Sequence, residues 1–168
     1  MSWFKALRNT VLAAIVLGTA ASLGACSFSP VYSGALADHP SINLAYAKPT
    51  TRLQQVIYQE LSLRLGHSES EVAPLATVAV SSSATEMMTT TTTNPSKPLE
   101  VTVTATLTIT ARDGSTAPAQ QFTRTAAADY TRSGQVLADN AAAEEAAERA
   151  AKSVAESLRL AVFAALSR

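Results

Sequence analysis

Cys26 is the residue that points most directly to chemistry, because it is the only cysteine among the 168 residues of the chain. No internal disulfide can form, so its thiol pairs with another protein, reacts, or carries a modification. Gly24 and Ala25 precede it. Two small residues let the chain lie extended in a peptidase cleft, and the thiol that follows can accept a diacylglyceryl group. The spacing therefore predicts cleavage before Cys26 and lipidation of its sulfur.

The first 25 residues have the order of a secretory signal peptide. Lys5 and Arg8 give a positive start, and residues 11–23 form an apolar run. As a helix this run would be about 20 Å long at ~1.5 Å per residue, short of the ~30 Å hydrocarbon core of a bilayer. Residues 1–25 are therefore predicted to be a removable signal peptide, and the Leu-Gly-Ala-Cys sequence at its end looks like a bacterial lipobox. The alternative is an ordinary signal peptide followed by an unmodified cysteine.

Acylation would place the mature chain at a membrane surface. One acyl chain gives only marginal, reversible binding, since each buried CH₂ contributes ~0.8 kcal/mol, whereas a triacylated cysteine would hold the protein firmly. Ser27 stands where Asp would favour retention in the inner membrane. By resemblance to Gram-negative sorting rules this favours the outer membrane, with the domain facing the periplasm. Residues 26–40 contain Pro30 and Pro40 and are predicted to be the lipidated tether of a single domain at 41–168.

The other reactive side chains do not form a catalytic or metal-binding pattern. His39 and His67 lack ligand spacing to each other or to an acidic cluster. Ser81–Ser83 are not part of a Gly-x-Ser-x-Gly elbow. The acidic residues within 144–148 are more simply interpreted as a solvated helix face. We therefore expect no enzyme activity, no cofactor and no metal site.

The charge balance argues against a role in nucleic-acid binding. The whole chain has 13 basic and 13 acidic residues. Lys5 and Arg8 leave with the signal peptide, so the mature chain keeps 11 basic residues against 13 acidic ones, a net charge of about −2 by count. Such a chain has no global basic field to attract phosphates.

The domain at 41–168 begins with a predicted strand and helix. Residues 41–46 alternate between apolar and other side chains and predict a short strand, which Pro49 ends. Thr50 or Thr51 can cap a helix over 51–66. The apolar stripe of this helix repeats every four residues: Leu53, Ile57, Leu61 and Leu65.

The middle of the chain has the pattern of β-structure. Residues 75–80 predict a strand, and the threonine-rich segment 85–93 predicts either another strand or a hairpin tip. The strongest signal is 101–111, where apolar residues alternate strictly with threonine, so one face should be buried and the other wet. The Asp-Gly pair at 113–114 predicts a turn into an antiparallel partner strand at 119–131.

The chain ends with a predicted long helix over 134–167, for which Ser133 is the expected N-cap. The expected fold is an α+β two-layer sandwich in the order β-α-β-β-β-β-α. It would have a mixed sheet of about four or five strands, covered on one face by the two helices. The threonine-rich face would stay open to water or to a partner.

Taken in order, these features resemble the LptE family of lipopolysaccharide-assembly outer-membrane lipoproteins, in its alphaproteobacterial form. The lipobox followed by SFSPVYSG resembles the family's CGFRPLYG start. The INLAY strand, the RLQQVIYQELSLRL helix and the hairpin around VTVTATLTITARDGS come next, and the closing helix resembles the end of the family's sequences. The resemblance covers nearly the whole mature chain through soft patterns. Two features depart from it: Ser29 stands where the family has Arg before a proline, and the threonine run is unusual.

The resemblance implies a non-enzymatic protein that sits as a plug in the lumen of the LptD β-barrel, assists its folding and helps deliver lipopolysaccharide to the cell surface. The family is held to bind lipopolysaccharide through basic residues. Lys97 and Arg112, both expected beside loop tips, are the candidates for contact with lipid phosphates. Two alternatives stay open: the auxiliary lipoprotein of an ABC-type lipid transport system, and a lipid-anchored hydrolase.

Overall fold

The computed structural model describes residues 42–87 and 96–166. Cys26, the expected signal peptide, the tether and the threonine run at 89–93 lie outside the described residues. The described elements, in chain order, are β1 (Ala45–Tyr46), α3 (Arg52–Leu65), β2 (Leu75–Glu86), β3 (Lys97–Thr110), β4 (Gln120–Arg132) and α4 (Val136–Leu166). Neither α3 nor α4 is long and apolar enough to cross a membrane.

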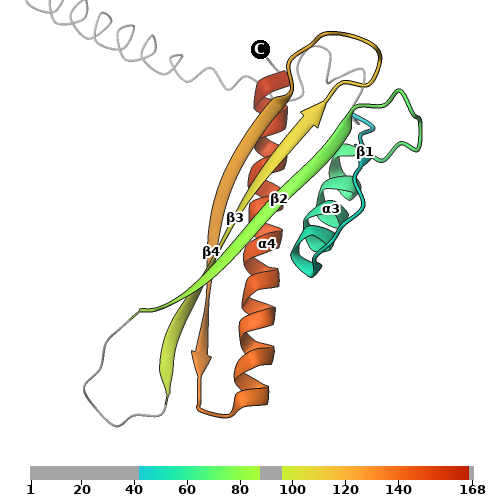
Figure 1. Ribbon diagram of the computed structural model, residues 1–168. Helices are drawn as coiled ribbons and strands as arrows, with labels where there is room; N and C mark the ends of the chain where they lie inside the picture. The colour runs from blue at the N-terminus through green and yellow to red at the C-terminus, as the bar shows by residue number, and fades with distance from the viewer. Residues whose placement is uncertain (1–41, 88–95, 167–168) are drawn as a thin grey trace, which may run out of the picture.

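The sheet has four strands in the order β1-β2-β3-β4. β1 runs parallel to β2, and the other neighbours are antiparallel, so the sheet is mixed as expected. Figure 1 shows that α4 runs along one face of the sheet and that α3 lies on the same side, next to the upper half of β2. The predicted α+β class and the two-layer arrangement are confirmed.

Two strands differ in extent from the prediction. Residues 75–86 form one continuous strand, because every residue of this segment has a partner in β3, from Leu75 opposite Thr110 to Glu86 opposite Leu99. The observed order is therefore β-α-β-β-β-α, with one strand fewer than the expected order, and its four strands agree with the expected sheet of four or five. The strand expected at 41–46 is reduced to β1, because Asn43 has a φ of 51°, outside the extended region.

Helix α3 begins and ends as the sequence predicts. Thr51 is the N-cap, and its side-chain oxygen accepts a hydrogen bond of 3.2 Å from the backbone N–H of Gln54. Gly66 ends the helix with a φ of 84° and donates its N–H to the carbonyl of Ser62. The buried face of the helix is Val56, Ile57, Tyr58, Leu61 and Leu65.

Tyr58 and Gln54 fasten α3 to the sheet. The Tyr58 hydroxyl accepts a hydrogen bond of 2.9 Å from the backbone N–H of Val78, and the Gln54 amide donates one of 2.9 Å to the carbonyl of the same residue. Both backbone groups belong to a residue whose side chain is buried. The helix thus satisfies backbone groups of β2 that no described strand pairs.

A Tyr58→Phe variant should therefore be destabilised by about 1–3 kcal/mol, because a buried N–H loses its acceptor. Urea denaturation of the mature protein measures the change. Tyr130→Phe is the matched control: Tyr130 is half-buried, and its hydroxyl forms no hydrogen bond with another described residue, so its loss should stay within about 0.5 kcal/mol. Equal losses in the two variants would contradict the role given to Tyr58.

Helix α4 begins later than expected, at Val136, and Ser133 is not its N-cap. The carboxylate of Asp139, in the first turn, instead accepts hydrogen bonds from the backbone N–H groups of Ser133, at 2.7 Å, and Gly134, at 2.9 Å. These bonds, first of all the one from Ser133, lower the pKa of Asp139. The sequence prediction missed this arrangement because Asp139 reaches back over five residues.

The lowered pKa gives a pH-dependent prediction. A carboxylate whose folded pKa is depressed adds stability above its unfolded pKa of about 3.9 and loses it as the pH falls through the folded value. Asp139→Asn should therefore lower the melting temperature by a few degrees at pH 7, with a smaller difference from the parent protein at pH 3. Thermal melts followed by circular dichroism test this, and an equal difference at both pH values would contradict it.

Candidate partner-binding surface

The candidate functional surface is the sheet face opposite α3 and α4, which neither of these two helices covers. In β3 the buried positions alternate with half-exposed threonines, as the sequence predicts. The register of the three long strands places their hydroxyl-bearing residues together on the uncovered side. This surface, called the hydroxyl face below, is made by Thr77, Ser81, Ser83, Thr85, Thr102, Thr104, Thr106, Thr108, Thr110, Thr123, Thr125 and Thr131.

Pairs of threonines join neighbouring strands across the hydroxyl face. The hydroxyls of Thr104 and Thr125 lie 2.9 Å apart, and those of Thr106 and Thr123 lie 2.8 Å apart. A hydroxyl is both donor and acceptor, so each pair can still bond to a third group. The face offers many small hydrogen-bonding groups in a fixed pleated array.

Charge is nearly absent from the hydroxyl face. On the outward positions of β2, β3 and β4, the described strands carry no lysine, arginine or aromatic residue. The exceptions to neutrality are Glu100 and Asp129, which lie directly opposite each other in the register of β3 and β4. Such a surface suits a polar, hydrated partner surface rather than a phosphate-rich or strongly apolar one.

Lys97 and Arg112, the predicted lipopolysaccharide contacts, lie at opposite ends of β3. A strand of 14 residues is about 45 Å long, so the two side chains cannot meet one headgroup. Lys97 is paired with Glu86 at 3.4 Å. Arg112 donates to the backbone carbonyls of Ala73 at 2.8 Å and Ser70 at 3.3 Å, which fixes the loop before β2. Binding of lipid phosphates by either residue stays a prediction.

Several of the other reactive side chains have structural roles. His67 stacks on Tyr46, with ring centroids 5.9 Å apart, and Ser81–Ser83 lie within β2. Glu148 pairs with Arg52 at 2.7 Å. Within 42–87 and 96–166 no three His, Cys, Asp or Glu side chains are grouped to hold a metal ion, and His39 lies outside this part of the chain.

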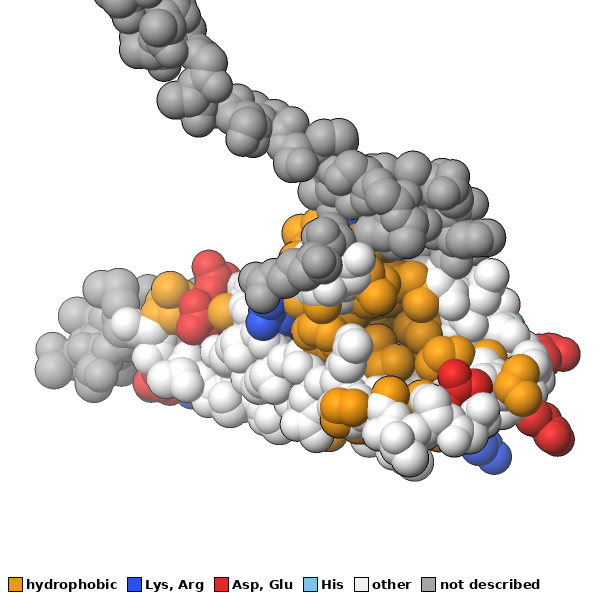
Figure 2. Space-filling view, turned by 90° about the horizontal axis from the view of Figure 1, so that it is seen from above, with side chains coloured by type: hydrophobic (Ala, Val, Ile, Leu, Met, Phe, Trp, Pro, Cys, Tyr) orange, Lys and Arg blue, Asp and Glu red, His pale blue; other side chains and the backbone are white. Residues whose placement is uncertain are grey.

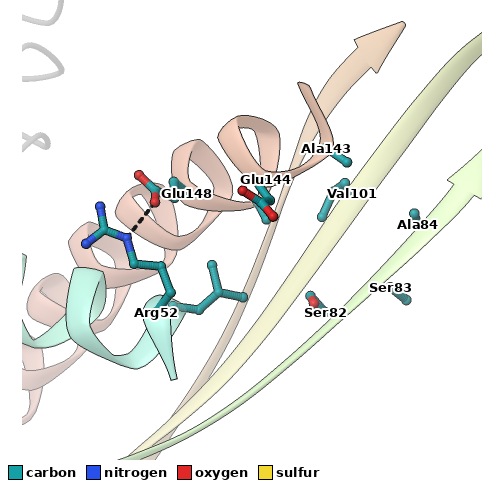
Figure 3. Close-up of a pocket in the computed structure, with 10 residues that line it drawn as sticks. Arg52, Ser82, Ser83, Ala84, Val101, Ala143, Glu144 and Glu148 are labelled. Carbon is teal, nitrogen blue, oxygen red and sulfur yellow. Dashed lines mark hydrogen bonds and ion pairs between the residues drawn. The ribbon is translucent and has the colours of Figure 1, made fainter. Parts of the chain in front are cut away.

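A groove that the sequence did not predict runs along the lower half of β2. It has a volume of about 470 Å³ and lies where the sheet extends beyond α3, opposite the first half of α4 (Figure 3). The groove forms where the inward positions of β2 change from Val78 and Val80 to the smaller residues Ser82 and Ala84. This distal groove is lined by Arg52, Leu53, Ser82, Ser83, Ala84, Val101, Ala143, Glu144, Ala147 and Glu148.

The end of the molecule at which α4 stops is apolar. Figure 2 looks onto this end and shows hydrophobic side chains around a hollow. In the last two turns of α4, Leu160 is 51% exposed and Leu166 is 43% exposed. Isolated exposed leucines are ordinary, but a gathered apolar surface marks a contact site for another molecule or a membrane.

Comparisons with known proteins give a fold class. No protein-family model and no curated protein matches the sequence, but solved structures do. A candidate lipoprotein from Caulobacter crescentus has a TM-score of 0.52 at 18% identity, covering 75% of this chain and 92% of its own. A minor lipoprotein from Acinetobacter baumannii has a TM-score of 0.54 at 16% identity, with 74% and 90% covered. Rare lipoprotein B from Shewanella oneidensis has a TM-score of 0.54 at 14% identity, with 74% and 94% covered. The chain therefore has a fold found in bacterial lipoproteins.

Proposed function

We propose that this protein is a non-enzymatic outer-membrane lipoprotein of the LptE type, which plugs the LptD β-barrel, supports its assembly and assists delivery of lipopolysaccharide to the cell surface. The hydroxyl face is the observation that carries the proposal. The interior of an outer-membrane barrel is polar and wet, because inward and lipid-facing side chains alternate along each strand. A face of small hydroxyl groups can approach such a wall closely and bond to it without burying unpaired charge.

The fold neighbours support the lipoprotein part of the proposal. They include rare lipoprotein B and a minor lipoprotein. The lipobox of this chain ends at Cys26, and the 16 residues from there to Ile42 can span up to about 55 Å when extended. This tether would let the domain reach into a barrel while its anchor stays in the bilayer.

The binding test places one large cation on the hydroxyl face. Thr104→Arg should weaken binding to the detergent-purified LptD barrel by at least about tenfold, or 1.4 kcal/mol, because the guanidinium prevents close approach of the two polar surfaces. Titration of the barrel onto immobilised mature protein measures the affinity. Thr104→Ser, which keeps a hydroxyl, should bind like the parent protein.

Two results would count against the proposal. Equal binding by Thr104→Arg and the parent protein, with unchanged melting temperatures, would remove the hydroxyl face as the contact surface. Co-purification of the parent protein with the subunits of an ABC-type lipid transporter, rather than with the barrel, would favour the alternative auxiliary lipoprotein. A pull-down from detergent-solubilised outer membrane separates these cases.

A further inference from the structure

One edge of the sheet is only partly paired. In a strand, the N–H and C=O groups of alternate residues point to opposite sides. In β2 the backbone N–H and C=O groups of the even-numbered residues point away from β3. The carbonyl of Ala76, like that of Pro74 just before the strand, accepts a hydrogen bond from β1 or the residue after it. The backbone groups of Val78 bond to side chains of α3. The same alternation directs the backbone groups of Val80, Ser82 and Ala84 to the outer side, where no residue of the described chain bonds to them. These three residues are called the free edge below.

The free edge is accessible. From Ser81 to Glu86 every residue of β2 is exposed, and Figure 1 shows that this half of the strand extends beyond α3. The opposite edge of the sheet is more protected, because Arg124 donates to the carbonyl of Thr123 at 2.7 Å and Arg149 to that of Asp129 at 2.8 Å. Charged side chains on an edge are a common defence against added strands. The two edges are therefore not equivalent.

The distal groove lies directly beside the free edge. Ser82 and Ala84 belong to both, and the groove floor adds the small apolar side chains of Val101, Ala143 and Ala147. A strand added at the edge would point alternate side chains into this groove, and small apolar ones would fit it. Such pairing combines affinity from main-chain hydrogen bonds with selectivity from the side-chain pocket.

The rim of the groove indicates the charge of the added segment. Arg52 is bonded to Glu148 at 2.7 Å, as Figure 3 shows. Glu144 also lines the groove but forms no ion pair within the described residues. The lining therefore has one uncompensated negative charge, which a lysine or arginine on the added segment would neutralise.

We propose that the free edge of β2 accepts an extended segment of the barrel partner as an additional strand, with small apolar residues in the distal groove and a basic residue beside Glu144. The identity of this partner rests on the proposed function. A closed barrel leaves no strand edge unpaired, so the segment comes from a loop or a terminus of the barrel protein rather than from its wall.

Amide hydrogen exchange tests the backbone pairing in the unmodified protein. On binding of the purified barrel, exchange at Val80, Ser82 and Ala84 should slow at least about tenfold, because their amides gain acceptors. The amides of Ser81 and Ser83, which already face β3, are the internal reference and should change little. Binding without added protection at the three edge residues would overturn the inference and leave the proposed function standing. Failure of the parent protein to bind the barrel would overturn both.

Two variants of one residue separate backbone from side chain. Ser82→Pro removes only an N–H that points outward, and proline is tolerated at such edge positions, so the variant should fold with a similar melting temperature yet bind the barrel at least about tenfold more weakly. Ser82→Ala keeps the N–H and should bind like the parent protein. Equal binding by both variants would contradict the inference, as would equal loss in both.

If Ser82→Pro melts early, Glu144→Lys tests the charge: it should weaken binding several-fold, and unchanged or tighter binding would contradict the inference.

Discussion

Cys26→Ala should lose all incorporation of labelled palmitate, and less than about a tenth of the protein should remain in the membrane fraction. Alanine has no sulfur to accept a diacylglyceryl group, and Cys26 is the only cysteine of the chain. Within the described residues, neither α3 nor α4 is long and apolar enough to span a bilayer. The effect is expected to be large because several acyl chains are lost together, each contributing about 0.8 kcal/mol per buried CH₂.

The control for this prediction separates the anchor from the barrel. Cells that lack the LptD barrel should be used for fractionation, because a plug held in the lumen would sediment with membranes even without lipid. Cys26→Ser should behave like Cys26→Ala, since the hydroxyl is not a thiol. Mass spectrometry of the parent protein should show cleavage before Cys26 and added acyl chains. A full-length chain with a bare thiol would contradict the lipobox interpretation.

The elements with a long regular pattern could be predicted from the sequence. Strict alternation over 101–111 requires one buried and one wet face, and β3 has that arrangement. An apolar residue at every fourth position from Leu53 to Leu65 requires one apolar stripe along a helix, and α3 buries most of this stripe. The alternation continues along most of β3, and the repeat of four residues continues over several turns of α3. A local irregularity therefore does not change the predicted type of element or its buried side.

Features that depend on one backbone angle or one distant contact could not be predicted. A positive φ at Asn43 shortens the first strand, and nothing in the alternation of its neighbours indicates this. Arg112 has the sequence context of a free loop-tip cation, but its guanidinium bonds to carbonyls 39 and 42 residues away. The distal groove was also missed, although the change to small residues at Ser82 and Ala84 was a usable signal.

The largest effect on stability is expected for Leu158→Ala. The first half of α4 buries mainly small side chains, Ala146, Ala150 and Ala151, which let the helix approach the sheet but remove little apolar area from water. The second half contributes the larger buried side chains, among them Leu158, which is fully buried in the shared core of helices and sheet. Truncation leaves a cavity there and should cost about 2–5 kcal/mol, a large part of the 5–15 kcal/mol typical of a domain.

Leu160→Ala on the same helix is the matched control for this loss. It removes the same atoms from a side chain that is 51% exposed, so its cost should stay below about 1 kcal/mol. With a urea m-value of about 1–3 kcal/mol per molar, the unfolding midpoint of Leu158→Ala should fall by about 1–2 M and that of Leu160→Ala only slightly. Equal shifts would mean that α4 does not hold the sheet through this part of its buried stripe.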